Sequence, residues 1–295
     1  MNKEGNTKSK SKKNTSGKSP KSIAAAALAR HKKAAAVIFI ALIVIILIIV
    51  KNNIMFYIYD GPGESSIYPE NEYSSEYFFR DVYNFENYDD GIYHGRRGID
   101  VSEHQGDIDW SLVKESGVEF AMIRVGYRGY NSGIISEDEY FEQNIEGAIE
   151  NGIDVGVYFF SQAVSTDEAI EEAKFVIDKV KKYDLTMPVA FDMEEVTDTD
   201  RILDLTTEER TEITDAFCKA VADHGEEALI YGNTKWFETK IDLSKLTNFD
   251  LWYAQYEYEN SFQYKHVMWQ YSCTGTVDGI STDVDLNIEF VKTGE

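Results

Sequence analysis

The chain has 295 residues, of which 43% are hydrophobic and only four are proline, so that its composition excludes a disordered or collagen-like protein. The two cysteines, Cys218 and Cys273, exclude a disulfide framework and a multi-cysteine zinc module. The net charge is −23, and residues 51–295 hold 51 Asp and Glu against 19 Lys and Arg. Because this acidic body would repel a phosphate backbone, nucleic acid is not an expected partner.

A basic tail, residues 1–33, precedes an uncharged apolar segment, residues 34–50. As a helix, this segment would span roughly 25 Å, slightly less than the hydrocarbon core of a bilayer. The flanking Lys32, Lys33 and Lys51 can snorkel to cover the difference. A cleaved signal peptide is the alternative, but no small-residue cleavage site follows. We therefore predict a transmembrane helix over residues 34–50, with the tail in the cytoplasm and the acidic body outside the cell membrane.

Residues 51–96 are predicted to form an acidic stalk between the membrane and the folded body. The segment has turn signals at Gly61-Pro62-Gly63, and it holds more Tyr and Phe than a plain spacer needs. Part of it therefore either packs on the folded domain or contacts a polymer, and the sequence leaves both possibilities open.

Residues 97–295 are predicted to form one α/β domain. Short apolar runs alternate with amphipathic helical patterns, two of which begin at the capping boxes Ser165-x-x-Glu168 and Thr206-x-x-Glu209. Cys218 falls on the apolar stripe of the second helix, which indicates a core residue. Apolar strands separated by such helices are typical of a parallel sheet covered by helices. The five runs are 98–102, 120–126, 154–161, 187–194 and 227–233.

The spacing tightens toward the C-terminus. The runs 250–256, 266–272 and 284–290 are separated by only nine and eleven residues, too few for a helical crossover between parallel strands. We therefore expect these three strands to lack flanking helices and at least one of them to run antiparallel. Residues 97–295, with eight predicted strands, are also fewer than the roughly 250 residues of a full (β/α)₈ barrel. The pattern therefore predicts a TIM-like but incomplete barrel.

Four carboxylates lie at or near the ends of predicted strands, where barrels of this type gather their chemistry. They are Asp100, Asp192, Glu194 and Asp285. The strand period of two places Asp192 and Glu194 on one face, whereas Glu195 faces away. Because two acids in a medium of low dielectric cannot both ionise cheaply, one should hold its proton near neutral pH. A protonated acid beside an anion is what glycosidic cleavage uses, and we select Glu194 as the proton donor.

The same acids have two other interpretations. In the structural one, they cap helices or pair with Arg124 and lysines. In the metal-dependent one, the four carboxylates and His104 would supply oxygen and nitrogen ligands to Mg²⁺ or Ca²⁺. A zinc site and a nucleophilic triad are poorly supported, because the histidines lack paired spacing and no G-x-S-x-G motif is present.

Aromatic residues in or beside the predicted strands favour a sugar ligand, although a barrel core also needs large side chains. We select six substrate-binding candidates from the strand ends, four aromatic and two polar. They are Tyr158, Tyr231, Trp252, Trp269, Gln270 and Arg124.

The run Gly98-Ile99-Asp100-Val101-Ser102-x-x-Gln105-Gly106-x-Ile108-Asp109-Trp110 resembles the opening of glycoside hydrolase family 25, the Chalaropsis-type lysozymes. The resemblance continues in order over about residues 96–291. It includes Pro188–Glu194 with its D-x-E, Tyr231-Gly232-Asn233, Leu251-Trp252-Tyr253-Ala254, Trp269-Gln270-Tyr271-Ser272 and Val284-Asp285-Leu286-Asn287.

The resemblance implies a (β/α)₅(β)₃ barrel and N-acetylmuramidase activity on the β-1,4 bond from N-acetylmuramic acid to N-acetylglucosamine in peptidoglycan, with no cofactor. It implies Glu194 as general acid, Asp192 orienting a substrate N-acetyl group that attacks, and Asp285 and Asp100 as the other site acids; a direct nucleophile is the competing mechanism. One departure lies before the last strand, where the family commonly reads Gly-Ile-x-Gly-x-Val-Asp: here Thr282 replaces the second Gly, and Asp283 adds a carboxylate on the same strand face as Asp285. A non-catalytic peptidoglycan-binding module and a metal-dependent hydrolase of a surface polymer stay open as alternatives.

Overall fold

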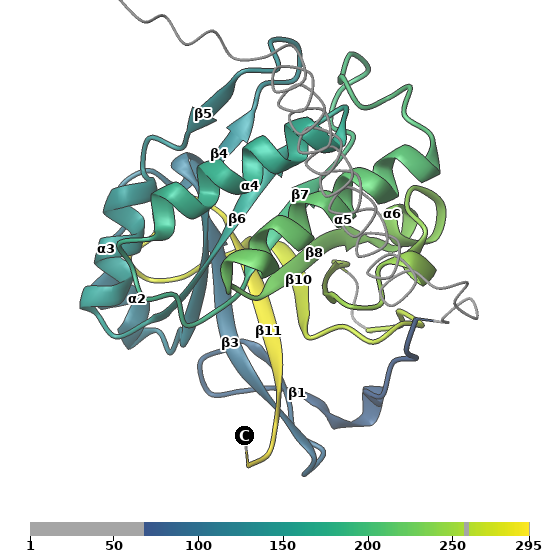
Figure 1. Cartoon of the computed structure of the whole chain (residues 1–295). Helices are drawn as coiled ribbons and strands as arrows, with labels where there is room; N and C mark the ends of the chain where they lie inside the picture. Colours follow the sequence, from purple (N-terminus) through teal and green to yellow (C-terminus); the bar gives the residue numbers. More distant parts are fainter. Residues whose placement is uncertain (1–67, 257–259, 295) are drawn as a thin grey trace, which may run out of the picture. The chain divides into compact units, whose positions relative to one another are not determined.

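The computed structural model describes residues 68–256 and 260–294 (Figure 1). The predicted transmembrane helix over residues 34–50 and the basic tail lie outside these residues. Within the part of the chain that is described, no helix is both long enough and apolar enough to cross a membrane.

Eight strands form a closed barrel. They are neighbours in the order β3 (Tyr93–Val101), β4 (Phe120–Arg128), β6 (Asp154–Ser161), β7 (Val189–Met193), β8 (Ala228–Asn233), β9 (Asp250–Ala254), β10 (Met268–Gly275) and β11 (Val284–Lys292). The pairing of β11 with β3 joins the last strand to the first. A short strand, β5 (Ile135–Glu137), pairs with β4 outside this ring.

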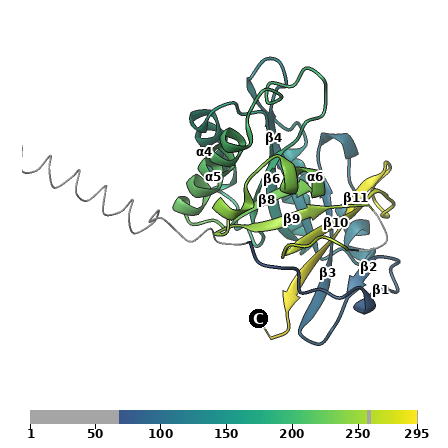
Figure 2. The same cartoon turned by 90° about the vertical axis from the view of Figure 1, so that its right-hand side faces the viewer.

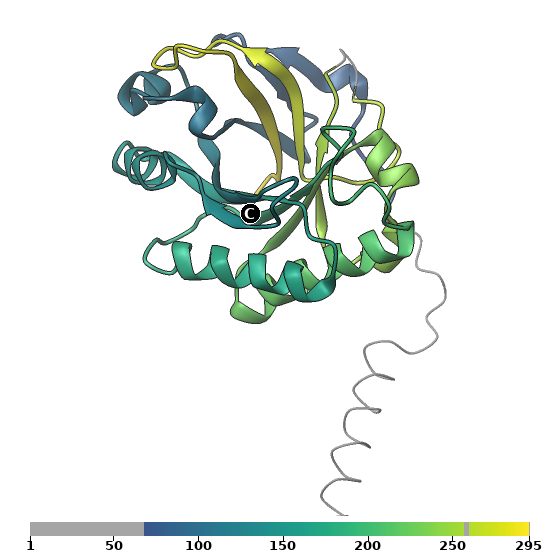
Figure 3. The ribbon, with the colours of Figure 1, turned by 90° about the horizontal axis from the view of Figure 1, so that it is seen from above.

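A helix follows each of the first five barrel strands and lies outside the barrel wall, as Figure 3 shows for α4 and α5. The helices are α2 (Trp110–Glu115), α3 (Phe141–Glu150), α4 (Thr166–Val180), α5 (Thr207–His224) and α6 (Thr234–Thr239). Two 3₁₀ turns, η2 (Glu103–Gln105) and η3 (Leu243–Lys245), lie in the loops.

The last three strands follow one another without a described helix between them, and β11 runs antiparallel to both of its neighbours. The spacing of the sequence therefore predicted the (β/α)₅(β)₃ order correctly. One part of the expectation was wrong: the ring of strands is complete, and only the outer layer of helices is incomplete. Because β11 is antiparallel to β10, a short connection without a crossover is enough to join them, and the pairing of β11 with β3 then closes the ring.

The capping residues of α4 and α5 show how local sequence sets the helix ends. The Thr206 side chain accepts from Glu209 N, and the Glu209 carboxylate accepts from Thr206 N, a reciprocal capping box. Gly225 ends this helix with φ of 109°, a left-handed conformation that suits glycine. At α4 only half of the predicted box forms: Ser165 caps the helix, but Glu168 turns its carboxylate toward Val164 N and Arg201.

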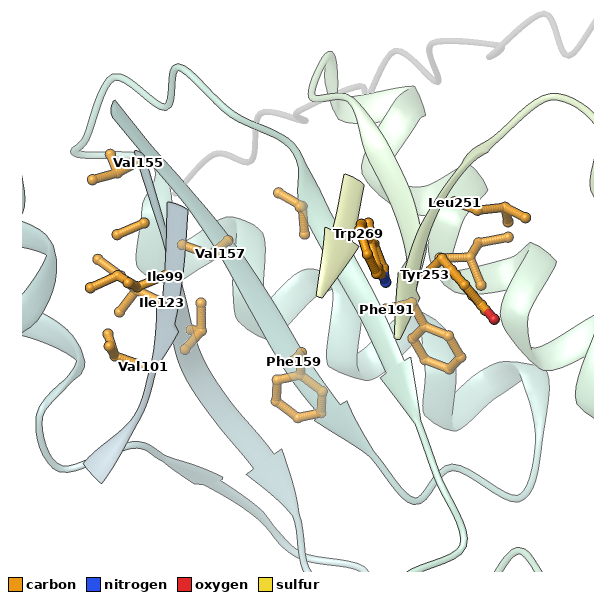
Figure 4. Packing of buried hydrophobic residues seen from close by; sticks show 14 of the residues in the cluster. Ile99, Val101, Ile123, Val155, Val157, Phe159, Phe191, Leu251, Tyr253 and Trp269 are labelled. Atoms are coloured by element: carbon orange, nitrogen blue, oxygen red, sulfur yellow. The ribbon is translucent and has the colours of Figure 1, made fainter. Parts of the chain in front are cut away.

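Side chains alternate between two apolar layers along each strand. The layer inside the barrel includes Phe120, Met122 and Trp252. Where β3 pairs with β4, the lack of a side chain at Gly98 leaves room for the Phe120 ring, because a Cβ at Gly98 would lie only 2.1 Å from that ring. The outer layer lies between the strands and the surrounding elements, and Figure 4 shows part of it. Its members include Ile99, Val157, Phe159, Phe191, Leu251 and Trp269.

The N-terminal segment replaces the missing helices. Residues 68–92 form η1 (Ser75–Tyr77) and the hairpin β1 (Phe78–Arg80) and β2 (Glu86–Tyr88), which lie beside β10 and β11 (Figure 2). The Tyr73 ring stacks on Phe290 of β11 at 3.8 Å between centroids, and Phe78 meets Trp269 of β10 edge-on at 5.4 Å. Tyr73 also donates to His266 O at 2.8 Å.

These contacts answer the question that the sequence left open about the aromatic stalk. Its described part, residues 68–96, packs on the domain and keeps the outer faces of the helix-free strands out of water. The first barrel strand begins at Tyr93, so the boundary expected at Arg97 falls inside β3.

Candidate active site

The four predicted carboxylates meet at one mouth of the barrel. Asp100 lies next to the last residue of β3, Asp192 lies near the end of β7, and Glu194 follows β7 directly. Asp285 is the second residue of β11, and its Cα pairs with that of Asp100. Because β11 is antiparallel, its beginning lies where the parallel strands end, which brings Asp285 to the same mouth.

A cleft of about 410 Å³ opens at this mouth. Three of the four acids line it, together with three of the four predicted aromatic residues and both predicted polar ones. The lining residues are Asp100, Glu103, His104, Arg124, Tyr127, Tyr130, Tyr158, Phe160, Asp192, Tyr231, Trp252, Tyr256, Gln270 and Asp285. Glu194 lies beside them, half-buried.

The acids influence one another's ionisation. Burial, followed by the charge of Asp285, raises the pKa of Glu194 to about 7. Burial and the charge of Asp100 raise the pKa of Asp285 to about 8. Burial also raises the pKa of Asp192 well above its usual range, with added repulsion from Glu194 and Asp100 and an opposing effect of Arg124. Near neutral pH the cluster therefore holds protons and negative charge together.

Asp100 differs from the other three because two amides donate to it. Asn287 Nδ2 and Gln270 Nε2 each lie 2.8 Å from Asp100 Oδ2. Burial raises the pKa of Asp100 to about 6, while these two hydrogen bonds oppose the rise. Trp252 Nε1 donates to Asn287 Oδ1 at 2.8 Å, and Tyr231 donates from its hydroxyl to Gln270 Oε1 at 2.9 Å. The amide orientations are thus set by donors behind them, and Asp100 is held as an acceptor.

Aromatic rings form one wall of the cleft. Trp252 contacts Tyr231 edge-on at 4.8 Å between ring centroids and Tyr158 at 6.1 Å. All three lie among the predicted substrate-binding residues. Their faces and the neighbouring carboxylates are the combination of apolar surface and polar groups that fits a sugar ring.

Arg124 lies in the cleft and is also paired. Its Nε donates to Asp138 Oδ2 at 2.7 Å, and its Nη2 lies 3.0 Å from Glu103 Oε1. The Asp138 side chain is fully buried. Arg124 therefore forms a structural ion pair, as one interpretation of the sequence expected, but with acids other than the four predicted carboxylates. It also lines the cleft, as expected of a substrate-binding residue.

Trp269 was wrongly placed among the cleft residues. It lies in the outer layer, where it contacts Phe78 and donates from Nε1 to Gln255 O at 3.0 Å. The physical reason is the strand period of two: Gln270 points into the barrel, so its neighbour Trp269 points out.

Two further acids lie apart from the cluster. Glu195 faces away, as predicted, and pairs with Arg210 at 3.0 Å and with Lys240. Asp283 precedes β11 and is exposed, outside the residues that line the cleft.

The cysteines and the metal interpretation can also be placed. Cys218 is fully buried, as predicted, Cys273 is exposed, and both are free. His104 lines the cleft. Over residues 68–256 and 260–294, no three His, Cys, Asp or Glu side chains are grouped so that they could hold a metal ion.

Several cleft residues were not predicted from the sequence. Asn287 does not line the cleft but donates to Asp100, and it could have been found because it lies two residues after Asp285 and so shares its strand face. Phe160 could also have been found, because it lies two residues after Tyr158 in β6. Tyr127 follows an irregularity in the register of β4, and Glu103, Tyr130 and Tyr256 lie outside the strands, so the strand period does not indicate their direction.

Residues 99–280, more than half of the chain, match the family model "Glycosyl hydrolases family 25". The chain therefore belongs to this family. It is 30% identical over 203 residues to Lysozyme M1 of Streptomyces globisporus, covering 65% of this chain and 67% of that one. It is 27% identical over 192 residues to an autolytic lysozyme of Clostridium acetobutylicum, covering 65% of this chain and 55% of that one.

Solved structures agree with the fold. A bacterial lysozyme from Streptomyces coelicolor superposes with a TM-score of 0.53 at 26% identity, covering 68% of this chain and 93% of that one. The modular autolysin LytC from Streptococcus pneumoniae, solved with a synthetic peptidoglycan ligand, has a TM-score of 0.61 at 23% identity, covering 72% and 52%. The family and its lysozyme members define the barrel of this chain as a glycosidase domain of the lysozyme class.

Proposed function

We propose that the chain is a membrane-tethered N-acetylmuramidase that cleaves the β-1,4 bond between N-acetylmuramic acid and N-acetylglucosamine in peptidoglycan. The observation that carries the proposal is the meeting of four mutually repelling carboxylates beside one aromatic-walled cleft, with the pKa of Glu194 raised to about 7 by burial and by Asp285. Such a group is still protonated near neutral pH and can act as an acid there.

In the first step, Glu194 donates its proton to the glycosidic oxygen as the bond from that oxygen to the anomeric carbon breaks. The carbonyl oxygen of the substrate's N-acetyl group forms the new bond to that carbon. Asp192 orients the N-acetyl group, and Asp285 stabilises positive charge on the sugar ring. Negative charge near a developing oxocarbenium ion is the electrostatic contribution such sites make.

In the second step, the ionised Glu194 takes a proton from water, whose oxygen attacks the anomeric carbon and releases the N-acetyl oxygen. Glu194 is thereby protonated again for the next cycle. Asp100, held by two amides, supplies a fixed negative charge on the β3 side of the mouth. In this proposal the glycan contacts five residues that line the cleft, namely Tyr158, Tyr231, Trp252, Gln270 and Arg124.

The test is incubation of the full-length protein with purified peptidoglycan, followed by assay of new reducing ends. Glu194→Gln keeps the shape of the side chain but removes the acidic proton, so we expect the rate of reducing-end release to fall about 10³-fold or more. Glu195→Gln is the matched control, because the neighbouring acid faces away and should leave turnover within a few-fold of wild type.

Mass spectrometry of the products then identifies the bond. A new reducing N-acetylmuramic acid is expected, whereas a new reducing N-acetylglucosamine would show a glucosaminidase. Saturable binding to peptidoglycan without soluble products would contradict the proposal in favour of a binding module. Loss of activity after exhaustive EDTA treatment would favour the metal-dependent alternative.

The tether is the second part of the proposal, and it rests on the apolar segment 34–50 and the basic tail before it. Cys273 is a native reporter for it, because it is exposed while Cys218 is buried. A membrane-impermeant maleimide should label intact cells that express the full chain, and Cys273→Ser should abolish the label. Labelling only after lysis, or recovery of the chain without membranes, would contradict the topology.

A further inference from the structure

The backbone of Glu194 lies outside the strand that presents it. Strand β7 ends at Met193, whose Cα pairs with Ser161, the last residue of β6. Glu194 is therefore the first residue beyond the ladder of backbone hydrogen bonds. A side chain that must meet a substrate oxygen needs another means of fixing its position.

Gln162 supplies a hydrogen bond at this point. It follows Ser161 directly, its side chain is fully buried, and its Nε2 donates to Glu194 O at 3.0 Å. Its Oε1 has no hydrogen-bond partner among the described residues. Turning the amide around would place Oε1 against the carbonyl of Glu194, so only the donating orientation is satisfactory. The Gln162 side chain thus extends the β6–β7 ladder by one more bond.

Gln162 is itself held from the helix layer. Arg201 Nη1 donates to Gln162 O at 3.0 Å. The same guanidinium makes two bonds to Glu168, at 3.0 Å and 2.8 Å, and Glu168 Oε2 also accepts from Val164 N at 2.9 Å. A two-bond pair of this kind fixes direction as well as distance, so the backbone of Gln162 is anchored to the start of α4.

We propose that Gln162 is a positioning residue that holds the backbone of Glu194 and so keeps its carboxyl at the half-buried place from which it acts. This inference rests on the proposed role of Glu194 as proton donor. It adds a residue that does not line the cleft and that acts only through Glu194.

The consequence for ionisation follows from burial. The largest cause of the raised pKa of Glu194 is its removal from water, followed by the charge of Asp285. A backbone that moves toward solvent would lower this pKa toward its ordinary value. The titratable groups whose charges interact with Glu194 come from several elements, namely Asp285, Asp192, Asp100, Tyr231 and Tyr130.

The test compares the full-length wild type with Gln162→Met, which keeps the length of the side chain and removes the donor. We expect kcat on peptidoglycan to fall about 10- to 100-fold with KM changed less than about threefold, because a misplaced catalytic group loses rate rather than binding. The alkaline limb of the kcat/KM profile should move to lower pH. Thr214→Val is the matched control: it removes another fully buried hydrogen bond, to Arg210 O within α5, and should leave the pH profile unchanged.

A titration of the Glu194 carboxyl by ¹³C NMR, assigned with Glu194→Gln, separates this inference from the proposed function. A lower pKa in Gln162→Met supports positioning even if wild type releases no reducing ends, a result that would refute the muramidase proposal alone. An unchanged pKa together with an unchanged pH profile overturns the inference. If Gln162→Met does not fold, the partly exposed Arg201→Met carries the test, with a smaller shift of the pKa in the same direction expected and no shift overturning it.

Discussion

Asp100 and Asp285 are directly paired residues on the antiparallel strands β3 and β11. Like charges opposite each other in a sheet are destabilising, and here both side chains are also largely removed from water. The pair, with the neighbouring Asp192 and Glu194, therefore opposes folding whenever it is fully ionised. Such strain at a cleft is expected where function, rather than stability, has set the residues.

Asp285→Asn should stabilise the protein at alkaline pH. The folded-state pKa of about 8 lies above the unfolded value of about 4, so the native state holds the proton more tightly. The stabilising contribution of this group is fully present below about pH 4 and is lost as the pH rises through about 8. The neutral Asn has no such loss, and at pH 8.5 we expect a gain of roughly 1–2 kcal/mol, allowing for partial exposure.

Urea unfolding of wild type and variant at pH 5 and pH 8.5 measures this gain, which should be much smaller at pH 5. Asp283→Asn is the control, because that carboxylate is exposed and should change the free energy of unfolding by less than about 0.5 kcal/mol. Equal stability of wild type and Asp285→Asn at pH 8.5 would contradict the interpretation of the paired acids.

Gln270→Met should move the acid limb of the pH–activity profile upward. The amide of Gln270 donates to Asp100 and lowers its pKa, so its removal lets burial raise that pKa above about 6. If Asp100 acts as an anion, activity at pH 5 falls more than activity at pH 7. Gln263→Met, an exposed substitution of the same kind, should leave the profile in place. A uniform loss at every pH would instead indicate that Gln270 contributes only to glycan binding.

Tyr73→Ala should show that the N-terminal segment is part of the barrel's core. Tyr73 is 8% exposed, stacks on Phe290 and donates to His266 O, so its removal leaves a cavity and an unpaired carbonyl. We expect a loss of about 3 kcal/mol or more in the free energy of unfolding. Tyr77→Ala, at a side chain 42% exposed, should cost less than about 1 kcal/mol. A loss for Tyr73→Ala as small as that for Tyr77→Ala would show that the segment contributes little to the stability of the barrel.

Arg128→Met should be strongly destabilising, in a pH-dependent way. Arg128 Nε lies 2.6 Å from Glu172 Oε1, and both side chains are buried. Burial raises the pKa of Glu172 to about 7 even with Arg128 present, so without it the carboxylate can be relieved only by protonation. We expect a loss of about 3–5 kcal/mol at pH 8 and a smaller one at pH 5.

The double variant Arg128→Met with Glu172→Met should recover most of that stability, because no unpaired buried charge is left. Lys181→Met removes an exposed pair with Asp178 and should cost no more than about 0.5 kcal/mol. A double variant as unstable as Arg128→Met alone would show that packing, not charge, is responsible.

Strand periodicity predicted much of the site. It placed Asp192 and Glu194 on one side of β7 and Glu195 on the other, and the ion pairs of Glu195 confirm the second placement. The same rule, applied to β10, would have excluded Trp269 once Gln270 was taken as inward-facing. The error arose because a large aromatic residue suits either face of a barrel strand, so residue type carried no information about direction.

Local patterns in the chain were enough for the order of strands and helices, for the lack of helices among the described residues after β9, and for the residue types that gather at strand ends. The reason is that hydrophobic period and connection length act over a few residues. Contacts between distant segments decided the rest. The closing of β11 onto β3 pairs Asp285 with Asp100, and the aromatic segment before Tyr93 covers strands some two hundred residues later in the chain. Neither follows from a local pattern, because the free energy of such contacts depends on which surfaces the folded barrel leaves uncovered.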